Sequence, residues 1–208
     1  MCTFVRMAET QTQTATDRPS STGRRYDPER KSRIIDAALT VIAEYGIART
    51  THRLIAAAAD VPLGSLTYHF ASLQDLCRQA FERQAEQMST TYAAHFEGVS
   101  TIDGLLDALV GLIHGGGDHD DWAISYELYL AALRDPELRH VTEAWMQASR
   151  RVLEQHLDPP TARMVDGLIE GLTMHRVLST APTTRDETRA LLERALAGTQ
   201  LARKTNLT

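Results

Sequence analysis

Apolar residues recur every three or four positions along most of this chain, which is the spacing of one face of an α-helix. Ile34, Ala38 and Ile42, for example, form one such row. No segment alternates apolar and polar residues for long enough to predict a β-strand. The pattern therefore predicts an all-α fold of about nine helices, over residues 28–45, 51–58, 62–69, 72–97, 101–113, 122–134, 136–157, 160–179 and 184–198.

The second and third predicted helices are short and separated by about one turn. Thr51 is expected to cap the first, Asp60 and Val61 to break the chain, and Pro62 to open the second. A helix as short as 62–69 is not stable alone, so neighbouring elements must hold it. Its small, hydroxylic and aromatic side chains suit an element laid against another molecule. The arrangement is typical of a helix-turn-helix, whose second helix enters the DNA major groove.

Residues 33–76 resemble the DNA-binding domain of the tetracycline-repressor (TetR) family. The matching positions are spread over about forty residues: Ile35, Ala37, Ala38, Tyr45, Gly46, Thr50, Thr51, Ile55, Ala56, Ala59, Val61, Gly64, Leu66, Tyr68, His69, Phe70 and Ser72. Leu63 and Leu73 depart from the family, because many members carry Lys at both positions. The rest of the chain resembles the family in length and helix pattern only.

The resemblance implies a division of the chain into a head and a body. Residues 27–71 would form the helix-turn-helix domain and residues 72–208 a helical effector-binding and dimerisation domain. Residues 1–26 are rich in Thr, Gln, Ser and Pro and are expected to be a disordered arm. The implied partner is double-stranded DNA with a palindromic operator, bound by a homodimer.

The family's DNA-binding roles can be carried over by position. The residues expected to face bases are Leu63, Gly64, Ser65 and Thr67, and those expected to contact phosphates are Thr51, Tyr68, His69 and Ser72. Arg49 and Arg53 are near enough to add positive charge. Leu63 cannot make the bidentate hydrogen bonds that read guanine, and can at most touch a thymine methyl. Specificity is therefore expected to depend on Thr67 and apolar contact.

The net charge of −5 argues against nucleic acid, but its distribution changes that picture. Residues 18–70 hold eight basic and five acidic residues, whereas residues 71–208 hold thirteen basic and twenty acidic ones. A basic head on an acidic body is expected when only the head meets phosphates. Arg24 and Arg25 could extend that charge through the arm into a minor groove. Uneven surface charge without a partner remains the alternative.

The body carries more aromatic and Met side chains than a tight bundle needs. With the resemblance, they imply a small, largely apolar or aromatic effector bound between helices, with Met88, Tyr92, Phe96, Trp122, Tyr126, Tyr129, Trp145, Met146 and His175 as candidate contacts. Ordinary core packing is the alternative. Glycines four residues apart at 167 and 171 would let another helix approach closely. The resemblance implies a four-helix dimer interface that includes Gly167, Leu168, Gly171, Leu172, Leu191, Leu192 and Ala195, against packing within one subunit.

Other chemistries find little support in the sequence. It holds no nucleophile elbow, phosphate loop or dinucleotide fingerprint, so no enzyme, cofactor or metal is expected. Residues 114–121 contain two His and three Asp, but three consecutive glycines favour a loop with helix-capping aspartates over a metal site. No apolar run approaches the length of a membrane span. Two isolated cysteines fit a reducing cytoplasm.

These observations predict a dimeric, ligand-responsive transcriptional regulator, a repressor released from its operator by its effector. Two alternatives stay open. One is a constitutive DNA-binding protein without an effector. The other is a helical protein-interaction module that has lost DNA binding, which the absence of the two lysines makes conceivable.

Overall fold

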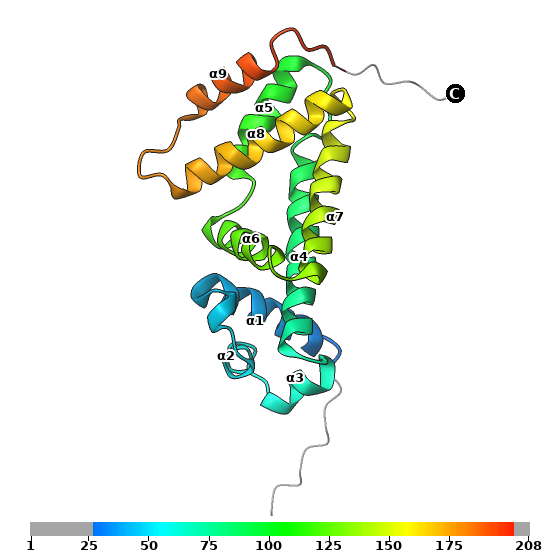
Figure 1. Cartoon of the computed structure of the whole chain (residues 1–208), viewed down its shortest axis with the longest axis vertical. Coiled ribbons are helices and arrows are strands. Elements are labelled where there is room, and N and C mark those ends of the chain that lie inside the picture. The colour runs from blue at the N-terminus through cyan, green and yellow to red at the C-terminus, as the bar shows by residue number, and fades with distance from the viewer. Residues whose placement is uncertain (1–26, 202–208) are drawn as a thin grey trace, which may run out of the picture.

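The computed structural model describes residues 27–201, and this part of the chain is entirely helical (Figure 1). Its elements are α1 (Arg30–Tyr45), a 3-10 turn η1 (Ile47–Arg49), α2 (His52–Ala58), α3 (Leu63–His69), α4 (Leu73–Ala94), α5 (Ile102–Gly115), α6 (His119–Ala132), α7 (Pro136–Leu153), α8 (Pro159–Leu178) and α9 (Arg185–Ala195). The predicted fold class is confirmed, and each predicted helix is present. The arm, with Arg24 and Arg25, lies outside the described residues.

Most of the helices begin at a side chain that accepts a backbone N–H, as expected for Ser, Thr and Asp caps. These capping residues are Thr51, Ser72, Thr101, Asp118, Asp135, Asp158 and Thr184. Helices α1 and α3 are the exceptions. Asp27, which precedes the first helix, binds Arg33 at 2.8 Å, and α1 begins at Arg30 rather than at residue 28.

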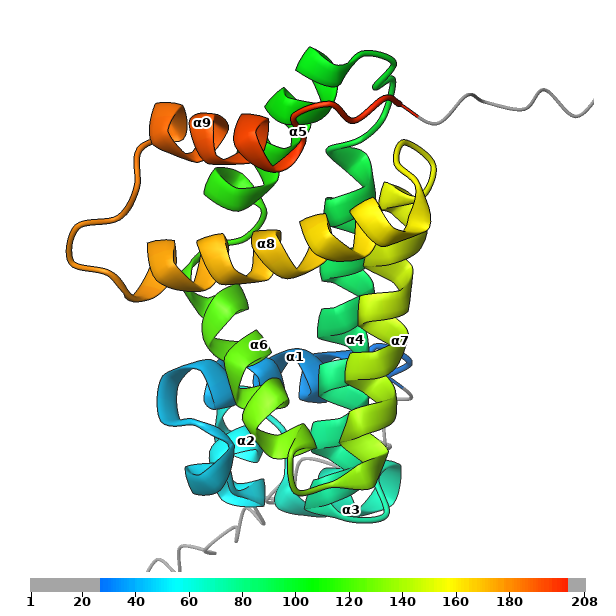
Figure 2. The same cartoon turned by 45° about the horizontal axis from the view of Figure 1, so that its top comes forward.

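The helices are arranged along one long axis. Helices α4 and α7 lie side by side along it, with α1, α2 and α3 at one end and α5, α8 and α9 at the other (Figures 1 and 2). Helix α6 lies between the two ends and packs against α1, α4 and α7. It is therefore in contact with both the head and the body.

The hydrophobic core has two parts, and neither coincides with the expected head. The lower core joins α1, α2 and α3 to α4, α6 and α7, so that Leu66 of the head and Trp145 of the body belong to the same cluster. The upper core joins the end of α4 to α5, α7, α8 and α9 around Phe96, Leu109 and Leu192. The head thus shares its core with the lower body.

Polar contacts also link the head to the body. The backbone N–H of Ile47 donates to a carboxylate oxygen of Glu127 on α6 at 2.9 Å. Gly46 has φ of +75° and lies so close that a Cβ there would be 3.0 Å from the other Glu127 oxygen. On the other side, Arg83 of α4 binds Asp36 of α1 at 2.6 Å. The orientation of α1 is therefore fixed by both α4 and α6.

Candidate DNA-binding surface and effector cavity

The reader pair, defined as α2 and α3, packs against the lower core on one face and is exposed to solvent on the other. Ile55 and Leu66 are fully buried in the lower core, where α2 packs against both α1 and α3. Asp60 turns the chain between them with φ of +50°. Tyr68 is 79% exposed and Leu63 47% exposed, so both point away from the subunit.

The four positions expected to face bases all lie on the short α3. Leu63, Gly64 and Thr67 are exposed, whereas Ser65 is partly buried. The hydroxyl of Thr67 donates to the carbonyl of Gly64 at 3.2 Å. Pro62 precedes the helix as its N-terminal cap residue rather than forming its first turn. Base contact by these residues stays a prediction.

The expected phosphate contacts lie on the reader pair and at the helix ends next to it, in η1 and at the start of α4. Thr51 is used as the cap of α2, where its hydroxyl accepts from the N–H of Leu54 at 3.3 Å. The His69 ring packs edge-on against Tyr68, with 4.9 Å between ring centroids. Arg49 and Arg53 are both exposed, and the Arg49 guanidinium lies 5.8 Å from the Tyr45 ring. The two arginines are thus free of acidic partners among the described residues.

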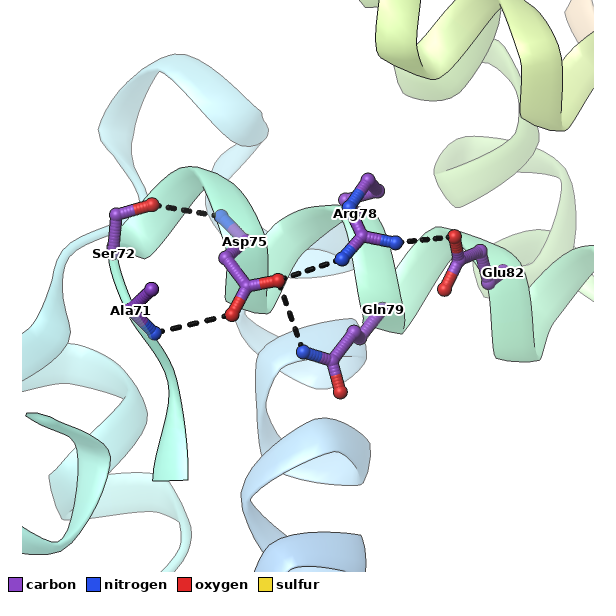
Figure 3. Close-up of polar contacts among 6 residues, drawn as sticks. All are labelled: Ala71, Ser72, Asp75, Arg78, Gln79 and Glu82. Carbon is purple, nitrogen blue, oxygen red and sulfur yellow. Dashed lines mark hydrogen bonds and ion pairs between the residues drawn. The ribbon is translucent and has the colours of Figure 1, made fainter. Parts of the chain in front are cut away.

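The start of α4 carries an acidic network beside Ser72 (Figure 3). The Ser72 hydroxyl accepts from the N–H of Asp75 at 3.0 Å, and the Asp75 carboxylate accepts from the N–H of Ala71 at 3.1 Å. Hydrogen bonds from Gln79 and Arg78 hold the pKa of Asp75 below its usual range. A fixed carboxylate therefore already occupies this helix N-terminus. Ser72 retains its own hydroxyl hydrogen for a phosphate.

The inner cavity lies where the two cores meet, between α4, α5, α6, α7 and α8. Four of the predicted effector contacts line it, namely Met88, Tyr92, Trp122 and Trp145. The sequence analysis did not identify its remaining polar members, which include Ser149, Glu170 and Thr173. The cavity is narrow, with a volume of about 20 Å³. This is room for about one water molecule.

An outer groove opens on the surface between α6, α7 and α8. Its volume is about 440 Å³, and it is lined by Tyr129, Met146, Asp166, Gly167 and Glu170, among others. Glu170 is the one residue that lines both the inner cavity and the outer groove. The two spaces therefore meet at its carboxylate.

The other predicted effector contacts lie at different distances from the cavity. Phe96 belongs to the upper core and stacks on Tyr92 at 5.3 Å between centroids. Tyr126 lies between Trp122 and Tyr129, at 6.3 and 6.5 Å. His175 is exposed and lines neither the cavity nor the groove. Three of the nine candidates, Phe96, Tyr126 and His175, thus line neither space, and Met146 and Tyr129 line the outer groove.

Several polar side chains around the cavity are buried without a partner. The Tyr92 hydroxyl, the Trp122 indole N–H, the Tyr126 hydroxyl and the Thr173 hydroxyl have no hydrogen-bond partner in the described part of the chain. Burial raises the pKa of Tyr92, and the nearby Asp166 and Glu170 raise it further. Native proteins rarely leave such groups unpaired, so each one requires an explanation.

Glu170 is the most informative residue that the sequence analysis missed. Its carboxylate accepts from the Tyr129 hydroxyl at 3.1 Å. Burial raises the pKa of Glu170, although the hydrogen bond from Tyr129 opposes that shift. A signal was present in the sequence, because Asp166 and Glu170 fall within the same turns as the buried Val165, Ile169 and Thr173. Acidic residues so placed within an inward-facing row are unusual.

The residues expected at a dimer interface divide between the surface and the core. Gly167, Gly171 and Leu191 are exposed, whereas Leu168, Leu172 and Ala195 are partly buried. Leu192 is fully buried within the upper core of the same subunit, so it packs internally. The exposed Met164, Met174 and Leu178 extend the apolar face of α8 along the row of the two glycines.

The loop rich in His and Asp is engaged in local structure. Asp118 and Asp121 form a reciprocal capping box at the start of α6, with hydrogen bonds of 2.9 and 3.1 Å. His114 is hydrogen-bonded to the Thr188 hydroxyl of α9 at 3.0 Å. This helix begins at His119, three residues before the position that the periodicity predicted.

An exposed reader pair at one end of a helical body with an internal cavity defines a class of protein, the helix-turn-helix transcriptional regulators. Residues 34–80 match the family model of bacterial regulatory proteins of the tetR family, and residues 100–198 match that of the tetracyclin repressor-like C-terminal domain. The chain belongs to the TetR family of transcriptional regulators. No helix in the described residues is long and apolar enough to cross a membrane.

Crystal structures of related proteins are known. The chain is 42% identical to the transcriptional regulator SCO7518 from Streptomyces coelicolor A3(2), with 82% of this chain and 99% of that one aligned at a TM-score of 0.76. It is 40% identical to the multidrug binding protein EbrR complexed with ethidium, covering 80% and 98% at a TM-score of 0.67.

A characterised regulator also matches in sequence. CymR of Pseudomonas putida, an HTH-type transcriptional regulator, is 29% identical over 126 residues. The match covers 61% of this chain and 62% of the length of CymR.

Proposed function

We propose that the protein is a cytoplasmic, homodimeric transcriptional repressor that leaves its operator when a small effector binds the body. The reader helix α3 would enter a major groove in each half-site, with the half-site spacing set by the two-fold axis of the dimer. The effector would occupy the inner cavity and the outer groove. Catalysis has no part in this proposal.

The exposure of α3 is the observation that carries the DNA-binding half of the proposal. A large aromatic side chain that is 79% exposed, as Tyr68 is, contributes little to the stability of the subunit. The same head exposes Arg49 and Arg53, although the protein as a whole has a net charge of −5. Such a surface fits a partner that carries phosphates and offers base edges.

The effector-binding half is supported by the cavity and by relatives. EbrR has been solved in complex with ethidium, with proflavin and with malachite green. These ligands are aromatic, and the cavity of this chain is lined by Tyr92, Trp122 and Trp145. An aromatic effector is therefore the class that we expect.

Two routes could carry a signal from the cavity to the reader pair. One is α4, which lines the cavity at Met88 and Tyr92 and begins directly after α3. The other is α6, which carries Trp122 on its cavity side and Glu127 on its head side. A ligand that displaces α6 would withdraw Glu127 from the N–H of Ile47 and release the head.

A second candidate function is a constitutive DNA-binding protein without an effector. The small volume of the inner cavity, about 20 Å³, favours it. Under this alternative the aromatic side chains form ordinary core. Native mass spectrometry of the protein purified from its host separates the two, because an effector-binding protein is expected to retain or accept a ligand.

The decisive experiment is a gel shift with the DNA that flanks the gene of this protein, followed by titration of aromatic ligands. The proposal expects a specific complex that a ligand dissociates. A Glu127→Ala variant should still bind the ligand while its operator affinity responds less to it. An absence of any specific complex with the flanking DNA, or with selected random DNA, would overturn the proposed function.

A further inference from the structure

Three basic side chains come from three helix ends that meet at one corner of the body. His114 lies in the last turn of α5, Arg176 in the last turn of α8, and Arg185 is the first residue of α9. Figure 2 shows the end of α5 between the end of α8 and the start of α9, and α5 packs against both helices. The basic corner, defined as these three residues with Thr183 and Thr188, lies at the end of the molecule away from the reader pair.

Hydrogen bonds fix the position of this corner. The His114 ring is hydrogen-bonded through Nε2 to the hydroxyl of the fully buried Thr188 at 3.0 Å, and the Thr183 hydroxyl lies 3.3 Å from that of Thr188. Arg185 is three residues before Thr188, so the two share one face of α9. Burial lowers the pKa of His114, and the charges of Arg185 and Arg176 lower it further. The two guanidinium groups therefore lie near the same imidazole ring.

The two arginines have no partner in the part of the chain that the structure describes. Neither Arg176 nor Arg185 forms an ion pair there, and the Nε of Arg176 is buried without a hydrogen-bond partner. The neighbouring Arg189 is different, because it binds Asp103 at 3.1 Å and Asp107 at 2.6 Å. Buried donors are rarely left unpaired in native proteins, so the guanidinium of Arg176 requires an acceptor.

The acidic side chains nearest in sequence to the corner are engaged elsewhere or exposed. Asp118 and Asp121 form the capping box of α6, and Glu187 forms that of α9 together with Thr184. Asp186 is exposed and forms no ion pair among the described residues. The positive charge of the corner is thus left without a neighbouring carboxylate that balances it.

We propose that the basic corner is a ligand site that binds a phosphate group through Arg176, Arg185 and His114. Phosphate is the group whose geometry guanidinium donors match with paired hydrogen bonds, and its two negative charges balance two arginines. The Thr183 hydroxyl adds a donor at the same place. None of these residues lines the inner cavity or the outer groove, so this site is distinct from that of the proposed effector. The inference goes beyond the proposed function and does not depend on it.

A phosphate at this corner would link two helices that otherwise touch little. Helices α8 and α9 each pack against α5 but make few contacts with each other. A phosphate held by both Arg176 and Arg185 bridges them directly. Because the ligand binds the folded protein only, it should also raise the melting temperature.

Inorganic phosphate is the first probe, and it is titrated into the full-length protein without DNA. Calorimetry measures the binding in a buffer whose ionic strength is held constant with chloride, so that general screening does not change. We expect a dissociation constant below about 1 mM. Glycerol phosphate, titrated in the same way, distinguishes the two sources of the group. Tighter binding of inorganic phosphate supports a site for the free ion, and tighter binding of glycerol phosphate supports one for the phosphate of an organic molecule.

Three variants assign the binding to the corner. Arg176→Gln removes the partly buried charge and should weaken phosphate binding at least about tenfold, since a charge-assisted hydrogen bond is lost. Arg185→Gln, at an exposed position that leaves the fold intact, should also weaken it. Arg163→Gln makes the same change of charge at an exposed position of α8, about 20 Å away along the helix, and should leave the affinity unchanged. Circular dichroism verifies that each variant is folded.

The results decide between a built site and general attraction of anions. Weaker binding in Arg176→Gln and Arg185→Gln, with unchanged binding in Arg163→Gln, supports the site. An equal loss in all three variants, or no loss in any of them, would mean an adventitious ion only and would overturn it. No binding to the wild type at about 10 mM phosphate would overturn it as well. A gel shift has no part in this test, so failure of the proposed function leaves the phosphate site in place.

Discussion

In the reader pair the polar groups are satisfied locally at the surface, whereas in the inner cavity they are buried and unpaired. Thr51 caps its own helix and Thr67 bonds the preceding turn, so α2 and α3 hold their conformation without help from a ligand. Tyr92, Trp122 and Thr173, by contrast, bury polar atoms that no neighbouring group satisfies. The polar groups of the reader pair thus have hydrogen-bond partners, whereas these three groups at the cavity have none in the described part of the chain.

The difference has an energetic meaning. A buried polar atom without a partner costs about 1–3 kcal/mol, which a ligand that supplies the missing hydrogen bond recovers. The hydrogen bonds of the reader pair are made without a ligand. We therefore expect its affinity for DNA to depend on how the body positions it. We infer that ligand binding acts on the position of the head through α4 and α6. It need not change the internal structure of the reader pair.

The largest expected effect concerns dimerisation, which brings the reader pairs of two subunits to one operator. Glu in place of Gly171 fits the subunit, since a Cβ there has no neighbour within 4 Å, but it would put charge into the proposed dimer face. We expect a folded monomer whose operator affinity is lower by about a hundredfold, because one half-site is lost. Sedimentation and gel shifts measure both properties.

The control for this variant is Gly115→Glu, at a position that also has open space but lies at the end of α5. It should remain dimeric and bind DNA normally. A Gly171→Glu protein that stays dimeric would place the interface elsewhere. The cavity lies within one subunit, so the monomer should still bind the effector.

The next effect tests whether the exposed face of α3 contacts DNA. Tyr68→Ala removes a ring that is 79% exposed, so the melting temperature should hardly change. Operator affinity should fall by about tenfold, because about 1.4 kcal/mol of contact with DNA is lost. Leu133→Ala removes a side chain that is 71% exposed on the body and should affect neither property. An unaltered operator complex for Tyr68→Ala would mean that this ring faces solvent in the complex.

The helices could be predicted because their signals are local. Periodicity, caps such as Thr51 and Ser72, and the break at Asp60 lie within a few residues of the structure they determine. The shape of the cavity depends on residues far apart in the chain. Glu170 of α8 reaches Tyr129 of α6, and Glu127 of α6 reaches Ile47 before α2, only after the helices between them have packed. No pattern along the sequence encodes those distances.

The same limit explains the residues that were placed differently. Leu191 and Leu192 are adjacent and equally apolar, yet the first is exposed and the second is fully buried. The packing of α9 on α5 decides which of them faces inward. His175 lies in an apolar helix but projects from its exposed side. Composition suggested His175 as a polar contact for the effector, whereas the polar residue of this stretch that lines the cavity is Glu170.

A smaller effect tests whether the buried hydroxyl of Thr173 lacks a hydrogen-bond partner in solution. Thr173→Val replaces a fully buried hydroxyl without a partner by a methyl group of similar size. The unliganded protein should become more stable, by about 1 kcal/mol, since an unsatisfied polar atom is removed. Denaturant unfolding measures the change. A loss of stability instead would show that the hydroxyl has a hydrogen-bond partner in solution.

The smallest expected effect is a pH dependence of the unfolding free energy that arises from the Glu170 carboxylate. Burial raises the pKa of Glu170 above its ordinary value of 4.5, so the folded protein keeps the proton at a pH where the unfolded chain has lost it. Stability at this site is therefore greatest at low pH and falls as the pH rises through that window. Glu170→Gln has no proton to lose. Asp166, whose pKa burial also raises, is present in both proteins.

The difference in unfolding free energy between Glu170→Gln and the wild type should therefore grow as the pH rises above 4.5, the ordinary pKa of Glu, and level off once the pH has passed the raised pKa of Glu170 in the folded protein. We expect the variant to be the more stable of the two proteins above that pH in the absence of ligand. Glu143→Gln, on an exposed face, should show no such trend. A difference that is constant with pH would mean that water reaches the carboxylate freely.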